Sequence, residues 1–182
     1  EVVQLLLDNG ADVNQAESKG YTSLFIASHN GHAAVVRLLL RAPGIKVNQA
    51  AMDGWTPLMI AAQNGHTEVA QLLLDHGVDV NQAEESWSWT PLLIAAQNGH
   101  AEIARLLLAA PGIRVNQAMN DGNTPLSIAA EKGHTEVAQL LLDNGADVNQ
   151  ATERGWTPLF IAARTGHTAA ARLLLERGAD VN

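Results

Sequence analysis

The chain has 182 residues, 47% of them apolar and 16% charged, and a formal net charge of −8. This acidic balance argues against a nucleic-acid partner, because phosphates are bound by clustered lysine and arginine side chains. The sequence contains no cysteine, which excludes disulfide bonds, thiol catalysis and thiolate metal sites.

No apolar run approaches the roughly 18 residues that a membrane-spanning helix needs, so we expect no membrane insertion. No signal peptide is visible, because Glu1 already lies inside a repeated block. Together with the absence of cysteine, these features lead us to expect a cytoplasmic protein.

A block of about 33 residues recurs along the chain and ends on the tetrapeptide Val-Asn-Gln-Ala. Repeats of this length build solenoids, in which each unit contacts only its neighbours. We therefore expect one elongated domain over residues 1–182. Its units are a partial block at 1–16 and full blocks at 17–50, 51–83, 84–118, 119–151 and 152–182.

The partial block 1–16 holds only the second half of a unit. Its apolar residues Val2, Val3, Leu5 and Leu6 would lie on a second helix without a first helix to cover them. Terminal repeats need polar outer faces, so we expect this segment to fray.

Each full block is predicted to begin with a short helix, and block 51–83 shows the signals clearly. Thr56 is a good N-cap, and Pro57 follows at the first helical position, where its missing N–H costs nothing. Gly65 can adopt the left-handed conformation that ends the helix. The block 17–50 differs, since it has Thr22-Ser23 in place of Thr-Pro.

A second helix is predicted from Thr67 to about Asp75, because Val69, Leu72 and Leu73 fall on one face. Both helices of a block are too short to be stable alone, so packing between neighbouring blocks must hold them. These signals recur in register and predict an all-α fold of about ten short helices.

Two departures from this pattern fall at loops. The second helices of two blocks end on Ala-Pro-Gly-Ile, at 42–45 and 110–113, with one extra residue; the alternation suggests duplication of a two-block unit. Block 84–118 also has a longer turn at 85–89, in which Ser88 replaces the usual glycine. Insertions at the rim of a solenoid usually fall on loops that can be functional.

The recurring Thr-Pro-Leu, Ala-Ala, Gly-His, Leu-Leu-Leu and Val-Asn elements resemble the ankyrin repeat over all 182 residues. The resemblance implies an ankyrin-repeat solenoid of stacked helix pairs with β-turn fingers. It also implies that first helices and fingers line the concave side, where family members bind other proteins. The repeats of the family are not enzymes.

The chain departs from the family pattern at two positions. The histidine after Thr-Pro-Leu is replaced by Phe25, Met59, Leu93, Ser127 and Phe160. The aspartate that usually opens the finger is replaced by Glu17, Ala51, Met119 or Thr152. We therefore expect weaker hydrogen bonding around the finger than the family pattern implies.

The residues favour neither a catalytic nor a metal site. One histidine column follows the glycine of each full block: His32, His66, His100, His134 and His167. Equivalent atoms of stacked helices lie about 10 Å apart, whereas a metal ligand lies about 2 Å from its metal, so we expect a structural role. Carboxylates such as Glu84 and Glu85 are consecutive, and no serine sits in a nucleophile motif. We expect no cofactor and no enzymatic activity.

The aromatic residues carry the functional signal. A first column just before the capping threonine contains Tyr21, Trp55, Trp89 and Trp156, with Asn123 as the polar exception. A second column, three residues past that threonine, contains Phe25, Met59, Leu93 and Phe160, with Ser127 as the exception. Gln63 and Gln97 share a helix face with the second column, and Trp87 lies on the longer turn. We predict that these residues bind a partner, because tryptophan and tyrosine are enriched at binding hot spots.

Packing between repeats is the alternative for both columns. We favour exposure for the first column, and for the second column the two alternatives are equally weighted. The leading function is a protein-binding module for a protein or extended peptide segment that carries apolar residues with Lys or Arg. The rivals are a structural spacer within a longer array and an engineered repeat protein. We expect a monomer, with end-to-end association as the alternative.

Overall fold

The computed structural model describes residues 10–181, and this part of the chain contains ten α-helices and no β-sheet. The segment expected to fray, residues 1–7, lies outside the described residues. The first helices of the five full blocks are α2 (Ser23–His29), α4 (Pro57–Gln63), α6 (Pro91–Asn98), α8 (Pro125–Lys132) and α10 (Pro158–Thr165). The second helices are α3 (Ala33–Leu40), α5 (Thr67–Asp75), α7 (Ala101–Ala109), α9 (Thr135–Asp143) and α11 (Thr168–Glu176).

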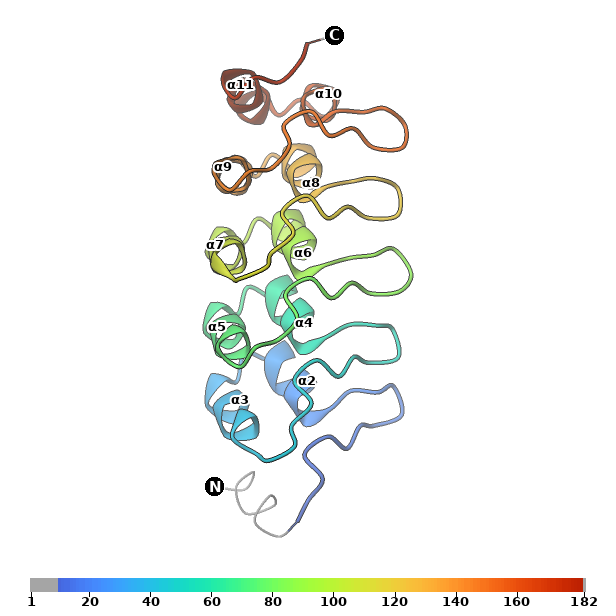
Figure 1. Ribbon diagram of the computed structural model, residues 1–182, viewed down its shortest axis with the longest axis vertical. Helices are drawn as coiled ribbons and strands as arrows, with labels where there is room; N and C mark the ends of the chain where they lie inside the picture. Colours follow the sequence, from blue (N-terminus) through green and yellow to red (C-terminus); the bar gives the residue numbers. More distant parts are fainter. Residues whose placement is uncertain (1–9, 182) are drawn as a thin grey trace.

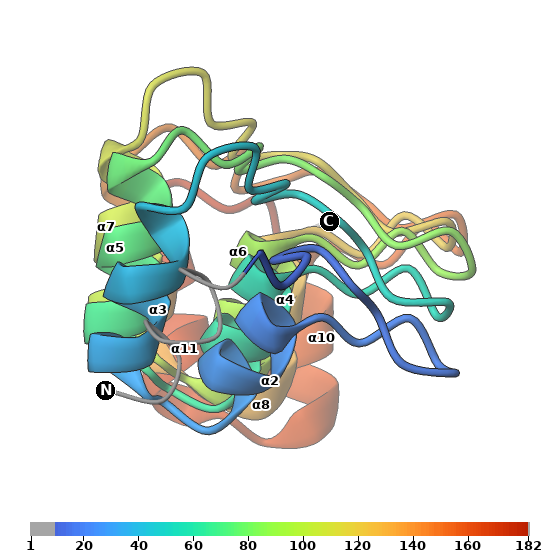
Figure 2. The same cartoon turned by 90° about the horizontal axis from the view of Figure 1, so that it is seen from below.

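The helix pairs stack in chain order along the long axis of the molecule (Figure 1). The first helices form one layer and the second helices another. The turns between blocks project as fingers on the side of the first helices that faces away from the second helices (Figure 2). This arrangement confirms the expected all-α solenoid of stacked helix pairs.

The first helices begin where the sequence predicts. In each full block the capping threonine accepts a hydrogen bond through its hydroxyl from the N–H three residues on, as Thr56 does from Met59 at 3.2 Å. Thr124 makes a complete capping box with Ser127, since the Ser127 hydroxyl accepts from the Thr124 N–H at 2.9 Å. The caps satisfy backbone donors that a short helix would otherwise leave unpaired.

The core is thin and runs the length of the described stack. Small residues let the first helices approach closely, and the fully buried alanines of these helices are Ala61, Ala62, Ala95, Ala96, Ala129, Ala130 and Ala162. Each second helix contributes the middle leucine of its Leu-Leu-Leu run to the same core, and three of them add a second buried leucine. The middle leucines are Leu39, Leu73, Leu107, Leu141 and Leu174. Burial of this apolar surface, at about 25 cal/mol per Å², provides the main stabilisation of each junction.

The histidine column has a structural role at the turn between the two helices. The ring of His66 lies against Gly31 of the preceding repeat so closely that a Cβ on Gly31 would come within 2.6 Å of it. The Nε2–H of His66 donates to the carbonyl of His29 at 3.0 Å, and His100 donates to Gln63 in the same way at 3.1 Å. The contact recurs at Gly65/His100, Gly99/His134 and Gly133/His167.

The asparagine of each Val-Asn-Gln-Ala segment also joins neighbouring repeats. The side-chain amide of Asn14 donates to the carbonyl of Gly44 at 2.9 Å, and its oxygen accepts from the N–H of Lys46 at 2.8 Å. The same pair of bonds recurs at Asn81 and Asn116. These bonds fix the loops after successive second helices relative to one another.

Candidate partner-binding surface

The first helices and the fingers together form the surface that we call the finger-side face. The first-column aromatics Tyr21, Trp55, Trp89 and Trp156 lie on it, and all four are half-buried. Trp55 and Trp89 pack on one side against the core, while part of each ring stays accessible. Trp55 and Trp89 of the first column are therefore both packed and partly exposed, whereas the sequence-based prediction treats packing and exposure as alternatives.

Packing between repeats, one of the two alternatives for the second column, describes three of its four apolar positions. Met59 and Leu93 are 0% exposed and belong to the core, which corrects their assignment to the partner surface. Phe25 is only 5% exposed, whereas Phe160 is 48% exposed. The difference arises because the next repeat covers this position, and no repeat follows Phe160 within the described residues.

The remaining predicted site residues are accessible to different degrees. The Gln63 side chain is exposed, and Gln97 is half-buried. Trp87, on the longer finger, is 61% exposed and is the most accessible aromatic residue of the described part of the chain. Trp87 and Gln63 are thus exposed to solvent, whereas the first column is half-buried.

A hollow of about 380 Å³ lies between the first two full repeats. Tyr21 and Phe25 form one wall as a stacked pair, with ring centroids 4.6 Å apart and planes 10° from parallel. The residues that line the hollow are Tyr21, Phe25, Ile26, His29, Asp53, Trp55, Ile60 and Gln63. Small-molecule and side-chain binding sites are typically concave and apolar with a few placed polar groups, which describes this lining.

The last repeat presents its tryptophan differently. The guanidinium of Arg164 lies 4.1 Å from the centroid of the Trp156 ring, and that of Arg154 lies 5.2 Å from it. Phe160 packs beside the same ring at 5.6 Å between centroids. Cations at these distances are attracted to the electron-rich face of the indole, so the chain itself provides cationic neighbours for Trp156.

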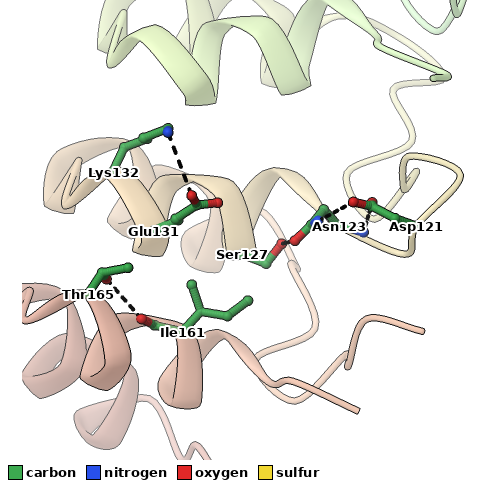
Figure 3. A network of polar contacts seen from close by, with 7 residues as sticks. All are labelled: Asp121, Asn123, Ser127, Glu131, Lys132, Ile161 and Thr165. Atoms are coloured by element: carbon green, nitrogen blue, oxygen red, sulfur yellow. Dashed lines mark hydrogen bonds and ion pairs between the residues drawn. The ribbon is translucent and has the colours of Figure 1, made fainter. Parts of the chain in front are cut away.

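The fourth repeat interrupts the aromatic row with polar side chains (Figure 3). The Ser127 hydroxyl donates to the side-chain oxygen of Asn123 at 3.1 Å, and the Asn123 amide donates to Asp121 at 2.7 Å. Glu131, one turn further along α8, pairs with Lys132 at 3.6 Å. These polar side chains form hydrogen bonds and an ion pair with one another, so this part of the finger-side face is polar.

The longer finger is held by a buried carboxylate. Glu84 is 4% exposed and accepts hydrogen bonds from the N–H groups of Ser86, Trp87 and Trp89. Burial opposes ionisation of this carboxyl group, but the three backbone donors outweigh burial and hold the pKa of Glu84 below its ordinary value. Glu84 thereby positions the backbone that carries Trp87.

The next finger supports the same turn from the other side. Ser88 adopts a left-handed backbone with φ of 64°, and its hydroxyl donates to the side-chain oxygen of Asn120 at 2.7 Å. Asn120 in turn donates through its amide to the carbonyl of Ser86 at 3.0 Å, and its backbone N–H donates to the carbonyl of Trp87 at 3.2 Å. The exposed Trp87 therefore stands on an ordered turn.

Several residues on this face escaped the sequence reasoning. Ile26 is 44% exposed and Met52, at a finger tip, is 81% exposed. Asp53 lines the hollow, and Arg154 flanks Trp156 together with Arg164, which the helical spacing already places on one face with Phe160. Aligning the finger positions of the blocks would have detected Asp53 and Arg154, because both stand two residues before a first-column tryptophan.

The described residues contain no group of three His, Cys, Asp or Glu side chains placed to hold a metal ion. Within residues 10–181, no helix has the length and apolar character that crossing a membrane requires.

A family model described as "Ankyrin repeats (3 copies)" matches the chain over residues 1–51, 44–119, 81–152 and 112–182. The overlapping matches together span the whole sequence. Comparison with curated proteins finds no match.

Proposed function

The chain belongs to the ankyrin repeat family, whose repeats are generally protein–protein interaction modules, and from that premise we propose that it binds a protein or extended peptide segment on the finger-side face. The resemblance implies that this face is the concave side of the solenoid. Binding there needs no catalytic group, in keeping with a family that is generally non-catalytic.

The observation that carries this proposal is the row of partly accessible aromatic rings on one face. Trp55 and Trp89 pack against the core and stay partly accessible, and Trp87, which is not part of the core, is 61% exposed. Rings held in this way lose little conformational entropy on binding, which is characteristic of hot-spot residues.

The spacing of the anchors favours a macromolecular partner. Neighbouring first helices lie about 10 Å apart, so successive anchors can contact one extended segment or one broad protein surface. A small molecule could occupy the hollow between the first two repeats, but it could not reach Trp89 and Trp55 together with Trp87.

A selection experiment tests the proposal. Peptides and small protein domains displayed on phage would be selected for binding to the intact array, and their dissociation constants would be measured against Trp55→Ala and Trp89→Ala. We expect each substitution to weaken binding by about 30-fold, which corresponds to about 2 kcal/mol.

The matched control is Leu175→Ala, which removes a 49% exposed apolar side chain from α11, in the second-helix layer. Because Trp55 and Trp89 also pack against the core, the tryptophan variants are compared at a temperature at which circular dichroism shows them folded. If the selected ligands bind both tryptophan variants as tightly as the wild type but lose affinity for Leu175→Ala, the binding surface lies in the second-helix layer. The finger-side face would then have the structural-spacer function.

A further inference from the structure

The hollow between the first two full repeats combines aromatic walls with a single carboxylate. Tyr21 and Trp55 supply half-buried rings, and Ile26 and Ile60 supply aliphatic surface. Asp53 is the one acidic residue in the lining. The Asp53 Oδ1 accepts a hydrogen bond from the backbone N–H of Trp55 at 3.1 Å, and Asp53 forms no ion pair within residues 10–181.

In the last repeat, the tryptophan at the equivalent position has arginine side chains of the chain itself as neighbours. Trp156 occupies the column position of Trp55, and two arginines lie against it at 4.1 and 5.2 Å from its centroid. Arg154 stands two residues before this tryptophan, and Arg164 stands eight residues after it.

At Trp55 the two equivalent positions hold Asp53 and Gln63. The ring therefore has no arginine of its own, and a carboxylate replaces one of the two cations. Lys19, the counterpart in the first finger, does not line the hollow, and the titratable groups that do line it are Asp53, His29 and Tyr21. The second repeat thus has the tryptophan ring of the last repeat, but it has the anion Asp53 at the position of the cation Arg154.

We infer that this hollow receives the side chain of a lysine or arginine from the partner, an inference that rests on the proposed function. The aliphatic stem would pack against Ile26 and Ile60, and the cationic head would lie over the Trp55 ring beside the Asp53 carboxylate. A cation over an aromatic face gains most when it is partly desolvated, as a hollow of about 380 Å³ allows. Only Asp53 of the acidic residues lines the hollow, but the block 51–83 carries Asp53, Glu68, Asp75 and Asp79 and no Lys or Arg, so its net charge attracts a cation over a longer range.

A direct test uses single capped amino acids as probes. N-acetyl-lysine amide and N-acetyl-arginine amide would be titrated into the full chain while the indole N–H signals of the four tryptophans are followed by NMR. We expect the Trp55 signal to shift and saturate with a dissociation constant in the millimolar range, and the Trp156 signal to stay unchanged. The neutral probe N-acetyl-norleucine amide has the stem without the charge and should bind about three- to fivefold more weakly.

Two variants and one matched control separate charge from packing. Asp53→Asn keeps a side-chain oxygen that can accept from the backbone N–H of Trp55 but removes the negative charge. It should therefore weaken binding of the cationic probes by about threefold. Asp121→Asn makes the same change at the equivalent position of the fourth repeat, where the Asp121 oxygen accepts from Asn123 at 3.0 Å. This control should leave probe binding unchanged.

The second variant copies the last repeat. Gln63→Arg places an arginine where Arg164 stands relative to Trp156, so it should fill the hollow from within and abolish the Trp55 shift. A folded Gln63→Arg variant that still binds the probes as the wild type does would overturn the inference. So would equal affinity for norleucine and lysine probes, or equal losses with Asp53→Asn and Asp121→Asn.

The outcome is separable from that of the proposed function. Selected ligands that depend on Trp55 and Trp89 but contain no essential Lys or Arg, together with a negative titration, would refute the cation site alone. Ligands that ignore both tryptophans would refute the proposed function, whereas the capped amino acids would still report on the hollow.

Discussion

At the scale of single residues, Glu84 shows how burial and hydrogen bonding compete. Its carboxylate lies under the longer finger at 4% exposure, a position that by itself disfavours charge. The three backbone N–H groups of Ser86, Trp87 and Trp89 favour the charged form and lower its pKa. Such a group stabilises the fold above the pKa of the unfolded chain and loses that contribution as pH falls through the folded pKa.

We therefore predict that Glu84→Gln destabilises the array by about 1–3 kcal/mol at neutral pH. Glutamine can accept with its oxygen but turns an amide donor toward the Ser86 N–H. The deficit relative to wild type should be largest above about pH 5. It should shrink as the pH falls past the ordinary glutamate pKa, where the unfolded chain takes up its proton, and on through the lower pKa of Glu84 in the folded protein. Urea denaturation between pH 3 and pH 7, at values chosen about one unit apart, measures the difference. A deficit independent of pH would show that the charge of Glu84 has no part in holding the finger.

Ser88 is the one described residue other than glycine with a positive φ, at 64°. Its backbone strain costs about 1 kcal/mol, and its hydroxyl bond to Asn120 returns a similar amount. Ser88→Ala keeps the strain and loses the bond, so it should lower the free energy of unfolding by about 1 kcal/mol. Ser88→Gly loses both terms and should be close to neutral. Equal effects of the two substitutions in urea denaturation would contradict this account.

At the scale of the elements, each turn between paired helices depends on the repeat that follows. Gly99 and Gly166 occupy equivalent positions with nearly equal φ values of 72° and 79°. A Cβ on Gly99 would come within 2.6 Å of His134, whereas a Cβ on Gly166 would meet nothing within 4 Å. The two glycines therefore separate the cost of the backbone conformation from the cost of the contact.

We predict that Gly166→Ala costs about 1 kcal/mol, the strain of a left-handed alanine. Gly99→Ala should cost at least about 1 kcal/mol more, because the His134 ring must move from its place against the turn. Thermal and urea denaturation of the two variants measure the difference. Similar losses would show that the histidine ring adjusts freely and contributes little to the junction.

The fingers form a second series of junctions. Backbone bonds join neighbouring fingers from Met52 to Lys19 at 3.0 Å, from Asn120 to Trp87 at 3.2 Å, and from Glu153 to Asp121 at 3.1 Å. In residues 10–181 no such bond joins the second finger to the third, which carries one extra residue.

We predict that the Glu85 amide, which would make the missing bond between the second and third fingers, exchanges its hydrogen faster than the amides of Met52, Asn120 and Glu153. Hydrogen exchange followed by NMR tests this order. Equal protection of all four amides would mean that the fingers are held by something other than these bonds.

At the scale of the whole molecule, the charge of −8 acts on association rather than on the fold. Opposite charges speed the encounter of two proteins, and salt screens this long-range attraction. For ligands selected on the finger-side face, we predict that raising the salt concentration about tenfold slows association by about tenfold and changes dissociation much less. Surface plasmon resonance measures both rates, and a salt effect confined to dissociation would contradict the prediction.

The sequence alone determined the architecture of this protein, because its signals are local and repeated. Threonine caps, proline at the first helical position, glycine at the turn and leucines on one face specify each helix pair without reference to distant residues. The five-fold recurrence of these signals then predicts the stack, and the same reasoning located the aromatic row.

Only the tertiary structure decided which of those aromatic and apolar side chains a partner can reach. Met59, Leu93 and Phe160 occupy one position in nearly identical helices, yet the first two are 0% exposed and Phe160 is 48% exposed. The hollow beside Trp55 likewise combines side chains of two repeats. Burial at a junction depends on the surface that the neighbouring repeat places against it, and that surface comes from residues about 33 positions away in the chain.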